Sequence, residues 1–327
     1  MPGLLTIDRR ERPDMPIQSR LRLGEEDRGE TLMNARLRAA IAASALAALS
    51  LTGLVACAPE PGETPPTTTG TPKPAPSESA QPEVPAEPEV PEKPDLTQAE
   101  LDQRLRDAAW ANDVVAAEQL IEWGADVNAA DDTVQSAYLI ATSEGRLELL
   151  RLTLKHGGDV KALDSWQGTG LIRAAERGHW DVSGALIRAG VDVNHVNNIG
   201  YQAIHEAVWL GRDDPTYLAT LRVLVAGGAE LDRLSVSEGL TPLQMAEERG
   251  FSGQAEVLRS LAAAAAPSDP GAALVEAART GDTTAVVAAL RAGADPRSAG
   301  SDGLTAVALA EAGGHVAAAQ VIRALGG

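Results

Sequence analysis

Short apolar segments with helical spacing alternate with glycine turns along the last two-thirds of the chain. The segment 171–177 contains a pair of small alanines and is followed by Gly178. The segment 181–189 then carries apolar residues from Val182 to Ile187 at helical spacing. Since glycine adopts the left-handed C-cap conformation at little steric cost, this pattern predicts two short helices separated by a tight turn.

The same pattern recurs at a nearly fixed period. Its central turn falls at Asn112, Gly145, Gly178, Gly211, Gly250, Gly281 and Gly314, with gaps of 33, 33, 33, 39, 31 and 33 residues. A second series, of the type Gly-Ala-Asp, follows the second helix of most units, as at 124–126 and 293–295. Such a period indicates a solenoid of about seven helix-turn-helix units. A solenoid presents a long surface and encloses no central pocket, so we expect a binding partner rather than a reaction.

These motifs resemble the ankyrin repeat. The segment 239–244, Gly-Leu-Thr-Pro-Leu-Gln, is similar to the opening of that repeat, and Gly178-His179 and Gly314-His315 match its central turn. The resemblance covers roughly residues 97–327 and implies an all-α ankyrin-repeat solenoid with short finger turns. It also implies that a monomeric chain binds a protein partner in the groove between its fingers and its first helices.

Two departures from the period suggest how the repeats are organised. Residues 212–216 are inserted between the helices of the fourth unit, and the alanine-rich segment 261–267 replaces the exit turn of the fifth. We therefore expect repeats 1–5 in residues 95–262 and repeats 6–7 in residues 268–327. The segment 261–267 is either a joint between two stacks or a shortened finger within one continuous stack.

The N-terminal part has a different composition. A short basic region and an uncharged Ala/Leu-rich run occupy residues 33–56 and end immediately before Cys57, the single cysteine of the chain. This resembles a lipoprotein signal peptide with lipid attached to Cys57. An ordinary signal peptide or an uncleaved anchor are the alternatives. Residues 1–32 do not fit before a signal peptide, so we interpret them as an upstream mis-start or a disordered extension.

A proline-rich segment follows the cysteine. Twelve of the 37 residues in 58–94 are proline, and most of the others are Glu, Thr, Ala and Ser. Such a composition cannot bury a core, so residues 57–94 are expected to form a disordered linker. Together with lipid on Cys57, the linker predicts a domain tethered to the cell membrane and facing the periplasm or the cell exterior. It predicts no contact with the membrane beyond the lipid anchor.

The net charge and the positions of potentially reactive side chains exclude several classes of function. The formal net charge of −18 argues against a nucleic-acid partner. The five histidines fall mostly in turns and helix ends, and we find no spacing typical of a zinc site, a nucleophile or a phosphate loop. The acidic pairs 131–132 and 213–214 are typical of turns and caps rather than of a calcium loop. We expect no catalytic residues, no cofactor and no metal.

Aromatic residues make up only 3% of the chain, so their positions are informative. Registered on the ankyrin pattern, units three and four place three aromatic and four charged side chains on the groove: Trp166, Tyr201 and Trp209 with Arg173, Glu176, Arg177 and Glu206. Trp, Tyr and Arg are the residue types that anchor interfaces. Alternatively, Trp209 packs on its neighbour and the charges pair across repeats.

These residues predict a non-catalytic scaffold that binds a protein partner through its concave face. An accessory or protective factor for a periplasmic or cell-surface enzyme is the second possibility. A small-ligand sensor or hydrolase that uses the groove near Glu206 and Arg173 is the third.

Overall fold

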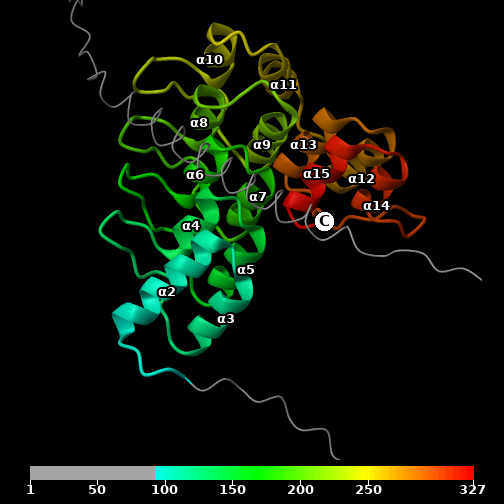
Figure 1. Ribbon diagram of the computed structural model, residues 1–327. Helices are drawn as coiled ribbons and strands as arrows, with labels where there is room; N and C mark the ends of the chain where they lie inside the picture. The colour runs from blue at the N-terminus through cyan, green and yellow to red at the C-terminus, as the bar shows by residue number, and fades with distance from the viewer. Residues whose placement is uncertain (1–92) are drawn as a thin grey trace, which may run out of the picture. The chain divides into compact units, whose positions relative to one another are not determined.

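The computed structural model describes residues 93–327 and contains fourteen α-helices in that range, with no strand beyond two isolated bridges (Figure 1). The helices form seven pairs, which confirms the predicted all-α solenoid of helix-turn-helix units. The first helices are α2 (Gln98–Ala111), α4 (Ala137–Ser143), α6 (Gly170–Glu176), α8 (Ala203–Trp209), α10 (Pro242–Glu248), α12 (Pro270–Thr280) and α14 (Ala306–Ala312). The second helices are α3 (Val114–Glu122), α5 (Leu147–Lys155), α7 (Trp180–Arg188), α9 (Pro215–Ala226), α11 (Ser252–Ala263), α13 (Thr283–Arg291) and α15 (Val316–Ala324).

Hydroxyl side chains begin most of the first helices. Thr97 opens α2 with a capping box in which Glu100 reaches back to the Thr97 backbone N–H at 2.9 Å. Thr169 and Thr241 cap α6 and α10 through the same Oγ1 acceptor. Each such cap satisfies a backbone N–H that the helix itself leaves unpaired, and it is worth about 1 kcal/mol.

The core of the first five units lies between the two rows of helices. First helices contact first helices from α2 to α10, and second helices contact second helices from α3 to α11. Fully buried leucines, among them Leu149, Leu171 and Leu186, fill the space between the rows. The alanine pairs on the first helices, such as Ala174 and Ala175, are fully buried as well, because a larger side chain would push neighbouring units apart.

The last two units pack on the second helices of earlier units. Helix α13 contacts α9 and α11, and α15 contacts α7 and α9 (Figure 1). Arg291 Nη1 donates to the backbone oxygens of Val225 and Ala229, at 2.9 and 2.8 Å. Arg188 Nη1 donates to the Ala324 oxygen. These bonds tie α13 to the C-terminal end of α9 and the turn that follows it, and α7 to the C-terminal end of α15.

Small residues make this contact possible. In the second unit the outward side of α5 carries the exposed Glu148, Arg151 and Lys155. The equivalent positions hold Gly184 on α7 in place of Arg151, and the buried Ala219 and Ala226 on α9 in place of Glu148 and Lys155. A Cβ on Gly184 would collide with the Ala324 carbonyl group, so only glycine permits this approach.

The insertion in the fourth unit joins two repeats. The Asp213 carboxylate accepts the backbone N–H groups of Gly253 and Gln254, both at 2.9 Å, and so holds the first turn of α11. Its neighbour Asp214 caps α9 and accepts from Thr216. This acidic pair therefore acts as helix caps, as its sequence suggests.

The predictions for residues 1–32, for 33–56, for Cys57 and for all but the last two residues of 57–94 lie outside the described residues. Among residues 93–327, no helix is both long and apolar enough to cross a bilayer.

Candidate functional site: the finger and first-helix face of units three to five

Three finger turns share one acidic or amide residue at the same position, 33 residues apart: Asp131, Asp164 and Asn197. Asp164 Oδ1 accepts the N–H groups of Trp166 and Gly168, both at 2.8 Å. Asn197 Oδ1 likewise accepts from Ile199 and Tyr201, at 3.2 and 2.9 Å. A side-chain oxygen that holds two backbone N–H groups fixes a turn without a strand. The fingers are therefore ordered by their own residues.

Neighbouring fingers are also bonded to one another. The Asn198 N–H donates to the Trp166 oxygen at 3.0 Å, and the Val236 N–H donates to the Gly200 oxygen at 3.1 Å. Gly200 has φ 95°, and a Cβ there would collide with Val236. The fingers of units three to five thus form a connected surface that needs little ordering when a partner binds.

Large apolar side chains are exposed on this surface. Trp166 is 42% exposed at one fingertip, and Leu234 and Val236 are 55% and 76% exposed at another. Leu210, which follows α8, is 43% exposed. Apolar side chains gathered on one face in this way are typical of interaction sites.

A cluster of charged groups lies on the first helices beside these fingers. We call Asp164, Arg173, Glu176 and Glu206 the acidic cluster. Arg173 pairs with Asp164 at 3.4 Å and with Glu176 at 2.8 Å. Glu206 accepts from Asn197 Nδ2 at 2.7 Å through Oε1, while its buried Oε2 has no hydrogen-bond partner. The cluster therefore holds three carboxyl groups and one guanidinium.

Burial shifts the titration of several groups in and near the site. Desolvation, reinforced by the neighbouring Glu176, raises the pKa of Glu206 to about 7. Burial lowers the pKa of His205 and of His179, so both rings are neutral at pH 7. Each ring places Nε2 3.1 Å from a backbone oxygen, that of Arg233 for His205 and that of Ser143 for His179, and donates to it in the Nε2–H tautomer. These two histidines are therefore structural, since each ring holds a backbone group of a neighbouring unit.

Two of the predicted partner-binding residues are not exposed. Tyr201 is 3% exposed: its hydroxyl donates to Glu238 Oε1 at 2.6 Å, and its ring lies 6.2 Å from those of His205 and Trp209. Glu206 is 4% exposed. The expectation that Tyr201 and Glu206 present themselves on the surface is therefore wrong, because the finger that carries Glu238 covers the first and the acidic cluster surrounds the second.

The other five predicted residues are wholly or partly accessible. Trp166 is exposed, Arg173 and Glu176 are partly buried in the acidic cluster, and Trp209 is half-buried with the Arg249 guanidinium 5.2 Å from its ring centroid. Arg177 is exposed and pairs with Glu144 of the preceding unit at 2.6 Å. The packing of Trp209 and the cross-repeat pair were both foreseen as the alternative to a binding patch, so these two contacts by themselves carry no function.

Sequence reasoning missed the finger residues that complete the site. Asp164 and Asn197 hold the turns and contact Arg173 and Glu206, and their 33-residue spacing was the available signal. Leu234 and Val236 gave no such signal, because their finger has a different length from the others.

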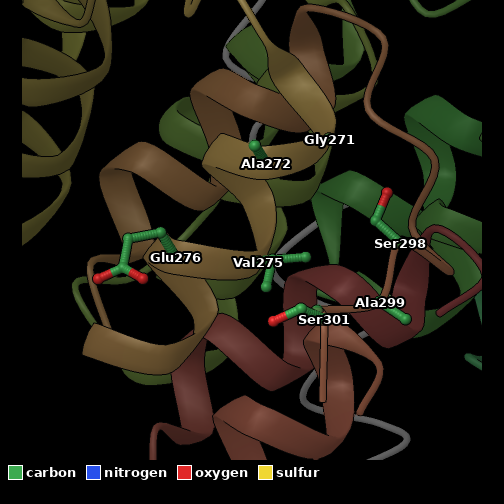
Figure 2. A pocket seen from close by; sticks show the side chains of 8 residues that line it. Gly271, Ala272, Val275, Glu276, Ser298, Ala299 and Ser301 are labelled. Carbon is green, nitrogen blue, oxygen red and sulfur yellow. The ribbon is translucent and has the colours of Figure 1, made fainter. Parts of the chain in front are cut away.

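A recess lies elsewhere, between α12 and the turn 298–301 (Figure 2). It has a volume of about 430 Å³, is open to solvent, and is lined mostly by Gly, Ala and Ser around Val275, with Glu276 as its single ionisable group. Its lining therefore provides few side chains that could bind a charged ligand or take part in a reaction. Within residues 93–327, no group of three or more His, Cys, Asp or Glu side chains is arranged to hold a metal ion.

Comparisons with known proteins agree with the repeat. The family profile described as "Ankyrin repeats (3 copies)" matches residues 138–233. The ankyrin repeat protein YahD of Escherichia coli (strain K12) is 34% identical over 140 residues, which are 42% of this chain and 69% of that protein. The NF-kappa-B p105 subunit of Rattus norvegicus is 31% identical over 116 residues, which are 35% of this chain but only 11% of that protein.

Among solved structures, an ankyrin repeat domain from Acinetobacter baumannii AYE is 45% identical, with a TM-score of 0.45, over 47% of this chain and 79% of that domain. The two relatives compared by sequence are named for ankyrin repeats and as a subunit of a nuclear factor. Because it covers more than two thirds of a relative with which it shares 34% identity, and because its seven helix pairs follow the repeat's turns and caps, the chain belongs to the ankyrin-repeat family.

Proposed function

We propose that this chain is a non-catalytic scaffold that binds a protein partner through the finger and first-helix face of units three to five. The observation that carries the proposal is the exposure of Trp166, Leu234 and Val236 on fingers that are already hydrogen-bonded to one another. Burying such side chains contributes roughly 1.5–3 kcal/mol each, and a surface that is already ordered loses little entropy on binding.

The chemistry of the face favours binding over catalysis. Arg173 is occupied by two carboxylates, and the neutral His205 is held by backbone groups at both ring nitrogens. Neither group is left to act as an acid or base on a substrate. We therefore prefer the scaffold to the hydrolase alternative, while a partner that is itself an enzyme fits the same face.

Photo-crosslinking in the native cell tests the binding face. A crosslinking amino acid placed at Trp166 or at Val236 is expected to capture a discrete partner. The matched control is Val115, an apolar residue that is 81% exposed on the second helix α3. Equal capture from Val115, or no capture from either finger position, would show that the partner uses another surface or that the chain binds none.

We further propose that the scaffold is extracytoplasmic and tethered by lipid on Cys57, on the strength of the apolar run and the proline-rich segment that flank this residue. Cys57→Ser should release the protein from the membrane fraction and change its mature mass. Retention in the membrane with an unchanged mass would refute the lipid anchor and leave the binding face untouched.

A further inference from the structure

The acidic cluster interrupts an apolar row. Along the first helices, one register position is filled by Ile140 in unit two, Arg173 in unit three, Glu206 in unit four and Met245 in unit five. Ile140 and Met245 are fully buried. An apolar residue therefore satisfies the packing at this position. The fold does not require the two charged residues, Arg173 and Glu206, that units three and four place there.

The cluster is also short of positive charge. Arg173 donates to Asp164 and Glu176, and no cation among the described residues is hydrogen-bonded to Glu206. The Glu206 Oε2 atom is buried without a hydrogen-bond partner, on a residue that is 96% buried. A carboxylate oxygen in that position carries the full cost of desolvation, and Glu176 adds repulsion. A cation bound beside Glu206 and Glu176 would relieve both.

The surroundings indicate which kind of cation fits. The described residues contain no metal-ligating group of three, so an organic cation matches better than a metal ion. Glu176 and Arg173 are the accessible members of the cluster, with side chains 17% and 22% exposed. Trp166 stands on the turn held by Asp164 and offers an exposed ring for an aliphatic stem.

We propose that this face recognises a basic side chain of its protein partner, an arginine or a lysine within an otherwise apolar segment, whose charged end pairs with the accessible Glu176 beside the buried Glu206 while its stem lies on Trp166. This inference rests on the proposed binding face and names the chemistry of the partner. The charged groups that act on Glu206 are Glu176 and Arg173 on α6 and Asp164 on the finger, while α10 contributes the uncharged Met245.

Panning a random peptide library against the full chain tests the proposal. Clones that bind the wild type and lose binding on Trp166→Ala define peptides of this face. These peptides are expected to share one basic position. Replacing that arginine by the neutral isostere citrulline, or that lysine by norleucine, should weaken binding about tenfold or more, as expected for a lost charged hydrogen bond.

Two variants separate a binding role of Glu206 from a structural one. Glu206→Gln should weaken the basic peptide about tenfold and leave its citrulline or norleucine form unaffected, whereas the exposed Glu256→Gln serves as the matched control. Calorimetry at pH 7 in buffers of different ionisation enthalpy should detect proton release on binding to the wild type but not to Glu206→Gln, because the bound cation favours the ionised carboxylate.

Face-dependent peptides without a basic preference, or with equal affinity for wild type and Glu206→Gln, would overturn the inference while the binding face stands. A library that yields only peptides insensitive to Trp166→Ala would instead count against the binding face itself and overturn both.

Discussion

Glu206→Gln should stabilise the fold at high pH and leave it nearly unchanged at low pH. Glu206 is 4% exposed, its Oε2 has no partner, and burial raises its pKa from 4.5 to about 7. The folded protein therefore binds the Glu206 proton more tightly than the unfolded chain does. The contribution of Glu206 to wild-type stability must therefore fall as the pH rises from about 4.5 to about 7, and it is constant above that window.

The magnitude follows from the same two values. At roughly 1.4 kcal/mol for each pH unit, the difference between 4.5 and about 7 is worth about 3 kcal/mol at most. Glutamine is neutral at every pH and keeps an acceptor for the Asn197 amide. The stability advantage of the variant over the wild type should therefore grow by up to about 3 kcal/mol between pH 4.5 and pH 8.

Urea denaturation followed by circular dichroism at several pH values measures this difference. His179 and His205 affect stability in the opposite direction, because their lowered pKa values make the folded protein lose stability as the pH falls. This effect is the same in the wild type and in Glu206→Gln, so it cancels in the difference between them. Glu256→Gln, on an exposed side of α11, should change stability by less than about 0.5 kcal/mol at every pH. An advantage of Glu206→Gln that is the same at pH 5 and at pH 8 would refute the reasoning.

Three further predictions test packing elsewhere. Gly184→Arg restores the charge that unit two carries at this position and should detach the last two units, so that elastase, which cleaves after alanine, cuts the segment 264–269 faster than in wild type, while Arg151→Ala leaves the rate unchanged. Tyr138→Phe removes a fully buried hydroxyl that has no partner among the described residues, and should raise the free energy of unfolding in urea by up to about 1 kcal/mol or leave it unchanged. A loss above about 1 kcal/mol would show that the hydroxyl is bonded. Asp213→Ala removes the acceptor that holds the first turn of α11 and should cost about 1–2 kcal/mol, measured as faster amide exchange in α11 than in α5.

Local chemistry explains why much of the fold could be predicted. Gly178 ends a short helix because glycine adopts φ 75° without strain, and Thr97 begins one because its hydroxyl satisfies a free N–H. Repetition at a constant spacing turns each of these local effects into a prediction for the whole chain. The candidate site was predicted less well from the sequence, since the exposure of a finger residue depends on the neighbouring finger. Tyr201 occupies a fingertip position in sequence, but Glu238 from the next finger closes over it.

The packing of the last two units depends on residues that no single repeat reveals. Gly184, Ala219 and Ala226 are ordinary helix residues until they are compared with Arg151, Glu148 and Lys155 at the same positions. The contact also joins helices far apart in sequence, which periodicity cannot pair. The division into repeats 1–5 and repeats 6–7 accordingly stays a proposal. The rate at which a protease cuts the segment 264–269 tests it directly.

The position of the acidic cluster within the stack explains how the fold tolerates the buried Glu206 carboxylate. Helices α7 and α9, directly behind the first helices that carry Arg173 and Glu206, contact neighbouring second helices on one side and α13 or α15 on another. Units three and four thus have support from both directions, and they can carry a destabilising charge of up to about 3 kcal/mol without local opening. Weakening that support with Gly184→Arg should therefore loosen the fingers of units three and four as well as the last two units. If amide exchange in those fingers is unchanged in Gly184→Arg, the stack alone holds the site in place.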